Sequence, residues 1–216
     1  MLDEAFNIMQ RGGTLMWAIL LVSVLTVTFV LERAYVLWVR YRLDINQFFE
    51  HLVELVEEQK YARALEVCNA QEQHPFARIA KAGLMKAGSP DRDIQRAMEA
   101  AAIREYPVIT QRVAYLATFA NVATLLGLLG TVLGLIDAFH GISEADMAAK
   151  QEILSKGIAV AMLTTAFGLV TAIPALLSYA LLQARQNVLL AQTEAKATEL
   201  LSYLAEKSRL GARRPG

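Results

Sequence analysis

Three long runs of uncharged, mostly apolar residues constrain this chain more than any other feature. They extend from Thr14 to Leu31, from Val113 to Ile136 and from Gly157 to Ala184. A helix of about 20 apolar residues crosses the roughly 30 Å hydrocarbon core of a bilayer. Backbone polar groups find no water there, and the runs lack the alternating polar positions of a barrel strand. They predict an all-α integral membrane protein with three transmembrane helices.

Composition excludes several other classes of protein. The 216 residues are 55% hydrophobic and 19% charged, which is too apolar for an ordinary soluble domain. The formal net charge is zero, and without a basic patch we expect no nucleic-acid partner. The single cysteine, Cys68, provides neither a disulfide framework nor metal-ligand spacing, so we expect no cofactor or metal. We interpret Cys68 as a buried apolar residue, with a reactive thiol as the alternative.

The distribution of basic residues predicts the topology. Arg33, Arg40 and Arg42 follow the first run, and Arg104 and Arg112 precede the second, which places the intervening segment in the cytoplasm. The expected organisation, in order, is an outer amphipathic N-terminus (1–12), a first span (13–39), a cytoplasmic helical region (40–112), a second span (113–139), an outer loop (140–152), a third span (153–184), and a cytoplasmic C-terminal helix and tail (185–216).

Helical periodicity extends through the cytoplasmic region. Apolar spacing predicts one amphipathic helix from Asp44 to about Cys68, and a second helix after the Gln73-His74-Pro75 interruption. Ser89 and Pro90 are expected as the N-cap and first residue of another helix, since Ser is a frequent cap and Pro is tolerated at the first position. We expect His51 and His74 to be solvated.

Both later spans are predicted to continue into long cytoplasmic helices. Between Pro90 and Phe139 the one break signal is Pro107, so the second span is expected to continue a preceding helix as a single rod. After Ala184 the chain stays rich in helix formers from Gln183 to Lys207, which extends the third span in the same way.

Small residues recur along one face of the second and third spans. This spacing allows two helix backbones to approach closely, which predicts that these spans pair tightly, while the first span, rich in Leu, Val and Phe, suits the lipid side. The residues concerned are Ala123, Gly127, Gly130 and Gly134 in the second span, and Gly157, Ala161, Thr165, Gly168 and Ala172 in the third.

Hydroxyl side chains lie beside these small residues. Thr124 and Thr131 share a face of the second span, and Thr164 and Thr165 lie near the middle of the third. Each hydroxyl alone is explained by a bond to a carbonyl of its own helix. Together they predict a polar seam, which in an oligomer arranged around an axis could wet a narrow pore.

The second and third runs contain no Asp, Glu, His, Lys or Arg. Proton relays in membranes normally need an ionisable group, so if protons cross here, another chain must supply the carboxylate.

Asp137 and His140 lie at the outer end of the second span, where we weigh interfacial anchoring or capping against proton collection. Pro174 predicts a kink in the third helix, either a packing bend or a gating hinge.

The glycine and threonine motifs resemble those of the MotA/TolQ/ExbB proton-channel family, in particular its ExbB/TolQ branch. The similarity is carried by Leu126 to Gly134 (LGLLGTVLG), by Gly157-Ile158-Ala159, by Thr164 to Leu169 (TTAFGL) and by Ala172 to Ala175 (AIPA). The layout of spans, cytoplasmic insert and helical tail also matches over nearly the whole chain. One departure is Val160, where ExbB and TolQ usually carry a glutamate.

The resemblance implies a function and partners. A homopentamer would surround the spans of two copies of an ExbD/TolR-like protein, whose single aspartate supplies the missing carboxylate. Thr131 and Thr165 match the family threonines that line the pore. The complex would lie in the bacterial inner membrane with a periplasmic N-terminus and a cytoplasmic C-terminus, and would energise outer-membrane transport through a TonB-like protein.

Three alternatives remain open at this stage. The complex could serve envelope maintenance, as TolQ does, or surface motility, because Val160 departs from the usual pattern. The chain could also be a non-conducting scaffold, since small-residue strips by themselves explain tight packing. An intramembrane protease is disfavoured because the chain has neither a Gly-x-Ser-Gly nor a His-Glu-x-x-His motif, so we expect no enzyme.

Overall fold

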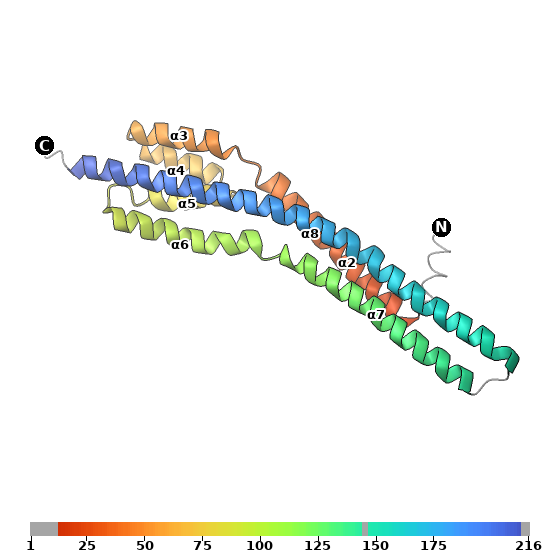
Figure 1. Cartoon of the computed structure of the whole chain (residues 1–216). Coiled ribbons are helices and arrows are strands. Elements are labelled where there is room, and N and C mark those ends of the chain that lie inside the picture. Colours follow the sequence, from red (N-terminus) through yellow and green to blue (C-terminus); the bar gives the residue numbers. More distant parts are fainter. Residues whose placement is uncertain (1–12, 144–146, 213–216) are drawn as a thin grey trace. The chain divides into compact units, whose positions relative to one another are not determined.

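The computed structural model describes residues 13–143 and 147–212, and its regular elements in this part of the chain are helices without strands, as expected for the all-α class. In order they are α2 (Thr14–Tyr35), η1 (Val36–Arg40), α3 (Ile45–Glu57), α4 (Tyr61–Ala70), α5 (Pro75–Leu84), α6 (Asp91–Thr110), α7 (Ala114–Ser143) and α8 (Met147–Ala212), shown in Figure 1. The expected N-terminus (1–12), residues 144–146 of the outer loop and residues 213–216 of the tail lie outside the described residues.

Three helical stretches are long and apolar enough to cross a membrane, which confirms the three predicted spans. They are Thr14–Arg40, Asp91–Ser143 and Ala149–Arg209. Helix α8 is one continuous helix of 66 residues, so the third span extends well beyond Ala184 (Figure 1).

The chain forms two compact units. The span unit comprises the described residues up to Glu32 together with Val113–Leu181. The bundle unit comprises Arg33–Arg112 together with the described residues from Leu182 onward. Helices α2 and α8 therefore contribute one part of their length to each unit.

In the bundle unit, the expected amphipathic helix from Asp44 to Cys68 is divided into two. Helix α3 ends at Glu57 and α4 begins at Tyr61, and Gln59 between them adopts a positive φ of 62°. Asp44 is the N-cap of α3, where its Oδ1 accepts bonds from the backbone N–H groups of Asn46 and Gln47. Cys68 is buried, as expected, and burial raises the pKa of its thiol to about 12, so it stays protonated at neutral pH.

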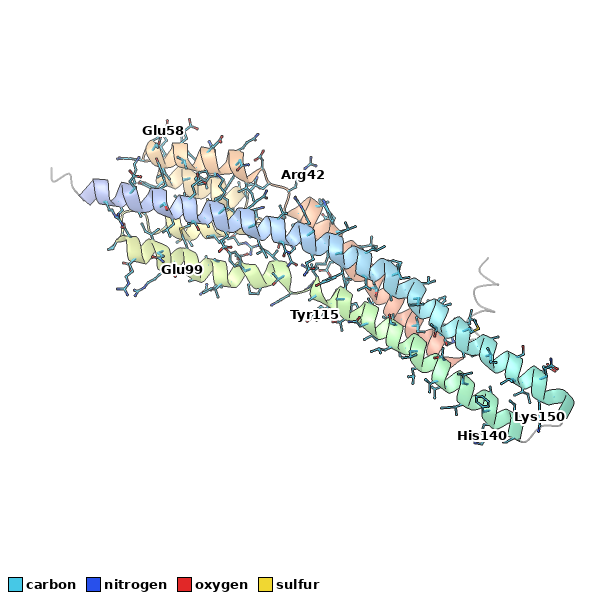
Figure 2. The ribbon with its side chains drawn as sticks, viewed as in Figure 1. Arg42, Glu58, Glu99, Tyr115, His140 and Lys150 are labelled. Atoms are coloured by element: carbon cyan, nitrogen blue, oxygen red, sulfur yellow. The ribbon has the colours of Figure 1, made fainter. Side chains whose placement is uncertain are left out.

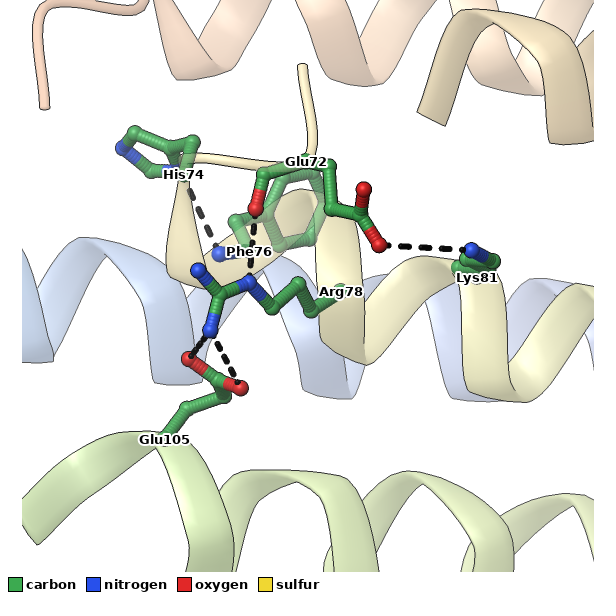
Figure 3. A network of polar contacts seen from close by, with 6 residues as sticks. All are labelled: Glu72, His74, Phe76, Arg78, Lys81 and Glu105. Carbon is green, nitrogen blue, oxygen red and sulfur yellow. Dashed lines mark hydrogen bonds and ion pairs between the residues drawn. The ribbon is translucent and has the colours of Figure 1, made fainter. Parts of the chain in front are cut away.

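The prediction that His74 is solvated is wrong. Its side chain is only 2% exposed, and the ring of Tyr41 meets it edge-on at 6.2 Å between centroids. His74 is the N-cap of α5, because its Nδ1 accepts a bond from the N–H of Phe76 (Figure 3). Burial lowers the pKa of His74 to about 4, which keeps the imidazole neutral and Nδ1 free to accept.

Helix α6 differs from the expected rod at both ends. Its N-cap is Pro90 and its first residue is Asp91, one position later than predicted, after Gly88 with a φ of 86°. It ends at Thr110, and a turn at 111–113 precedes α7. Pro107 lacks an N–H and so removes one helical bond close to this end, which is a physical reason for the break.

An ion pair and an aromatic cluster join helices of the bundle unit. The Arg78 guanidinium donates to both carboxylate oxygens of Glu105 at 3.0 and 2.9 Å, which joins α5 to α6, and its Nε donates to the Glu72 carbonyl (Figure 3). The Phe76 ring packs against those of Phe48 and Phe49. The later part of α8 completes this core through a buried stripe with spacings of three, four and seven residues: Leu182, Gln186, Leu189, Thr193, Leu200 and Leu204.

In the span unit, α7 and α8 approach so closely that side chains are excluded from one face. A Cβ on Gly127 would lie 3.2 Å from the carbonyl oxygen of Thr164, and one on Gly134 would lie 3.3 Å from Ala161. A Cβ on Gly168 would lie 2.7 Å from the carbonyl oxygen of Ala123. Gly157 similarly faces Ala138. Backbone meets backbone along this contact, so dispersion contacts replace the hydrophobic driving force that lipid does not supply.

Helix α2 covers part of this pair. Val22 joins a buried cluster with Ala120, Ala123, Ala172 and Ala175, and Phe29 packs edge-on against Phe119 at 5.2 Å between centroids. The rest of the α2 surface carries exposed apolar side chains, which suit contact with lipid: Trp17, Leu21, Val24, Leu25, Val27 and Leu31.

The burial of His74 predicts a pH-dependent stability. In the unfolded chain the pKa of this imidazole is near its usual value of 6.5, whereas in the folded chain burial lowers the pKa to about 4. Stability therefore falls as the pH drops through this window, by at most about 3 kcal/mol. We expect thermal unfolding of the detergent-purified protein to show this loss, and the His74→Asn variant, which keeps an N-cap acceptor, to lack it. Parallel pH profiles would contradict the assignment.

The contact between α7 and α8 predicts that Gly168→Ala destabilises the protein by about 1–3 kcal/mol, because the added carbon meets a backbone oxygen that cannot move independently. Helix propensity alone predicts the opposite sign, since Ala favours a helix over Gly by about 1 kcal/mol. A matched control is Val170→Ala on the same helix, where the side chain is 67% exposed. Thermal unfolding in detergent measures both, and a Gly168→Ala protein as stable as the wild type would show that the helices are not this close.

Candidate functional site

Thr165 forms a hydrogen bond between the two closely packed helices. Its hydroxyl on α8 donates to the carbonyl oxygen of Gly127 on α7 at 3.1 Å, and the side chain is partly buried. Because Gly127 has no side chain, its carbonyl is accessible to a neighbouring helix. The bond holds the Thr165 hydroxyl beside Gly127 of α7.

Thr164 occupies a different position from its neighbour. It is 1% exposed, and its hydroxyl donates to the carbonyl of Ala161 at 2.8 Å in its own helix. A Cβ on Gly130 would lie 2.5 Å from the Thr164 hydroxyl oxygen, so this threonine fills the space that the glycine leaves. The adjacent residues Thr164 and Thr165 thus differ: the first lies inside the helix contact and the second lies at its edge.

Thr124 and Thr131 of α7 have hydroxyls bonded within their own helix. Thr131 donates to the carbonyl of Leu128 at 2.6 Å, and Thr124 donates to that of Ala120 at 3.0 Å. Thr124 is exposed and Thr131 is half-buried in the single chain. Each hydroxyl oxygen keeps lone pairs available, so both side chains can accept a hydrogen bond from a group beside α7.

The buried face of α8 includes a threonine that sequence reasoning missed. Thr171 is 7% exposed and its hydroxyl donates to the carbonyl of Phe167. It lies seven residues after Thr164, and helical spacing from Thr164 was the signal that could have found it. The buried positions on this part of α8 are Ala161, Thr164, Gly168, Thr171, Ala172 and Ala175.

Polar groups near the C-terminal end of α7 are exposed. Asp137 and His140 are both on the surface of the single chain, and Figure 2 shows His140 near the end of α7, with Lys150 on the first turns of α8. The Ser143 hydroxyl donates to the His140 carbonyl. Exposure of both side chains is compatible with interfacial anchoring and with proton collection.

Pro174 lies within the continuous helix α8 and is exposed, beside the buried Ala175. Its missing N–H leaves the carbonyl four residues earlier, that of Val170, without its usual helical donor. The kink assigned to Pro174 stays a prediction.

Within residues 13–143 and 147–212, no group of three or more His, Cys, Asp or Glu side chains is arranged to hold a metal ion. At the contact of α7 and α8, the polar groups described above are hydroxyls and backbone carbonyls next to closely packed small residues. Such groups donate and accept hydrogen bonds, but they neither gain nor lose a proton near neutral pH.

Comparison with known proteins supports the interpretation of these motifs. Residues 71–195 match the model of the MotA/TolQ/ExbB proton channel family, and this range contains all the threonines and glycines discussed above. The chain is similar to the Tol-Pal system protein TolQ of Haemophilus influenzae, with 44% identity over 94 residues. This match covers 44% of the chain but only 41% of that relative.

Two longer matches come from Synechocystis sp. The putative biopolymer transport protein ExbB-like 1 is 31% identical over 179 residues, covering 82% of this chain and 70% of the relative. ExbB-like 3 is 32% identical over 169 residues, covering 78% of this chain and 80% of the relative. With a family match over more than half of its length and these relatives, the chain belongs to the MotA/TolQ/ExbB proton channel family, as an ExbB/TolQ-like membrane protein.

Proposed function

We propose that this chain is the channel-forming subunit of a proton-driven motor in the bacterial inner membrane. The observation that carries the proposal is the closely packed pair α7 and α8, which bears hydroxyls at its edge but has no Asp, Glu, His, Lys or Arg between Val113 and Ile136 or between Gly157 and Ala184. A polar conduit without a fixed charge can pass a proton only with an acid from elsewhere. The family is one of proton channels rather than of enzymes, and we propose no catalytic role.

The acid belongs, in this proposal, to a dimer of a single-span ExbD/TolR-like partner enclosed by a homopentamer of this chain. Thr131 and Thr165 line the pore and hydrogen-bond to the partner's carboxyl group or to water. Thr124 lies about two turns before Thr131 on α7. Thr164 fits a packing role better, because its side chain fills the space over Gly130. The glycines set the spacing between α7 and α8, and Pro174 bends α8.

The energised process is, in our proposal, TonB-type transport across the outer membrane. A Tol-type system for envelope maintenance is the second candidate, favoured by the 44% identity over 94 residues to a protein named for the Tol-Pal system. Copurification distinguishes the two: the chain is coexpressed with one ExbD-like and one TolR-like protein carrying different tags, and the partner that it retains in stoichiometric amount identifies the system.

The role of the hydroxyls is tested by proton flux into vesicles that contain the chain together with its partner. We expect Thr165→Val and Thr131→Val each to lower the flux about five- to tenfold, because a hydrogen bond between uncharged groups contributes roughly 1 kcal/mol. The Thr165→Ser variant keeps the hydroxyl and is expected to have the proton flux of the wild type. Thr28→Val is the matched control, since this exposed threonine of α2 bonds only to the Val24 carbonyl of its own helix. Unchanged flux in both pore variants would show that these hydroxyls do not line the proton path, and absence of flux in the wild type as well would favour a non-conducting scaffold.

The proposed topology has a periplasmic N-terminus and a cytoplasmic C-terminus. It predicts that a membrane-impermeant maleimide applied to right-side-out spheroplasts labels the Glu152→Cys variant but not the Glu58→Cys variant. Both glutamates are exposed, and Figure 2 shows Glu58 pointing away from the bundle. The native Cys68 gives little background because it is buried and protonated. Labelling of the Glu58→Cys variant before lysis would reverse the orientation.

A further inference from the structure

A pocket of about 330 Å³ lies in the bundle unit between the start of α3 and one face of α8. This volume is in the range of small-molecule sites. The pocket has a mixed polar and apolar lining: Leu43, Asp44, Ile45 and Asn46 from the segment at the start of α3, and Arg185, Gln192, Ala195 and Lys196 from α8. None of these residues belongs to the proton pathway proposed above.

The lining carries two cations and one carboxylate. The Asp44 carboxylate is engaged at the helix start, where its Oδ1 accepts two backbone bonds at 3.1 and 3.2 Å. The Lys196 ammonium is held 4.4 Å from the centre of the Phe49 ring and 2.7 Å from a carboxylate oxygen of Glu199. Both groups are therefore fixed in place by the protein itself.

Arg185 differs from these two groups. Its Nε is buried and has no hydrogen-bond partner among the described residues. Arg185 also lines the pocket, so its guanidinium is placed to donate to a ligand bound there. A guanidinium presents a planar set of donors that matches phosphate oxygens. The pocket thus favours an anion with several oxygens.

The sequence position of the pocket selects the source of that anion. Arg185 directly follows Ala184, the last residue of the expected third span, and Leu43 follows Arg40 and Arg42 after the first span. These positions belong to the cytoplasmic headgroup layer, where anionic lipids are concentrated. Gln192 and Lys196 lie about 10 and 16 Å further along α8, at a rise of roughly 1.5 Å per residue, where the polar part of a headgroup could reach.

The geometry points to a binding site for the phosphate group of an anionic phospholipid of the cytoplasmic leaflet, with Arg185 as its main donor. Lys196 and Gln192 contact the headgroup beyond the phosphate. The inference rests on the proposed topology but not on proton conduction. Its function is to fix the start of α3 and the exit of α8 at one depth in the membrane.

The test measures lipid retained by the full-length protein purified in mild detergent and the rise in unfolding temperature on adding phosphatidylglycerol, phosphatidylcholine or inorganic phosphate. For the wild type we expect retention of, and stabilisation by, phosphatidylglycerol, with little effect of the other two. Arg185→Gln is expected to lower retained phosphatidylglycerol at least fivefold. Ala195→Phe, which fills the pocket without changing charge, is expected to have the same effect, so a folding defect in one variant leaves the test intact.

Arg42→Gln is the matched control, since Arg42 is exposed on the segment before α3 and does not line the pocket (Figure 2). We expect it to retain as much lipid as the wild type. Three results would overturn the proposal: undiminished retention in both pocket variants, an equal loss in Arg42→Gln, which would indicate general surface charge, or displacement of the lipid by inorganic phosphate, which would indicate a soluble anion. Proton flux is not the readout, so a non-conducting chain could still pass this test.

Discussion

The close contact of α7 and α8 is the interaction on which the rest of the span unit depends. Lipid offers no hydrophobic force to hold two apolar helices together, so backbone approach through glycine has to supply the packing. Gly127, Gly134 and Gly168 each face backbone of the other helix at distances that leave no room for a side chain. This approach brings the Gly127 carbonyl within reach of Thr165 and so positions the proposed pore hydroxyl.

Much of this arrangement could be predicted from the sequence, because membrane spans and small-residue strips are local patterns. The three spans are confirmed, and the glycines of both strips lie where the two helices meet. The adjacent threonines could not be separated by spacing alone. Thr164 and Thr165 are 100° apart on a helix, and only the position of Gly130 shows that Thr164 is the residue inside the contact.

The bundle unit was less predictable, because its features depend on contacts distant in sequence. His74 is a polar residue before a proline, and nothing near it indicates that Tyr41, 33 positions earlier, packs against its ring. The break between α3 and α4 has no Gly or Pro, and Gln59 with its positive φ carries no sequence signal. The lining of the pocket at Arg185 likewise joins segments more than 130 residues apart.

The central claim is that the conduit formed by α7 and α8 passes protons only with an acid from another polypeptide. The most direct measurement is proton flux into vesicles that contain this chain alone, the chain with its single-span partner, or the chain with a partner whose membrane aspartate is replaced by asparagine. The account predicts flux only in the second case. Flux through the chain alone, or undiminished flux with the asparagine partner, would contradict it.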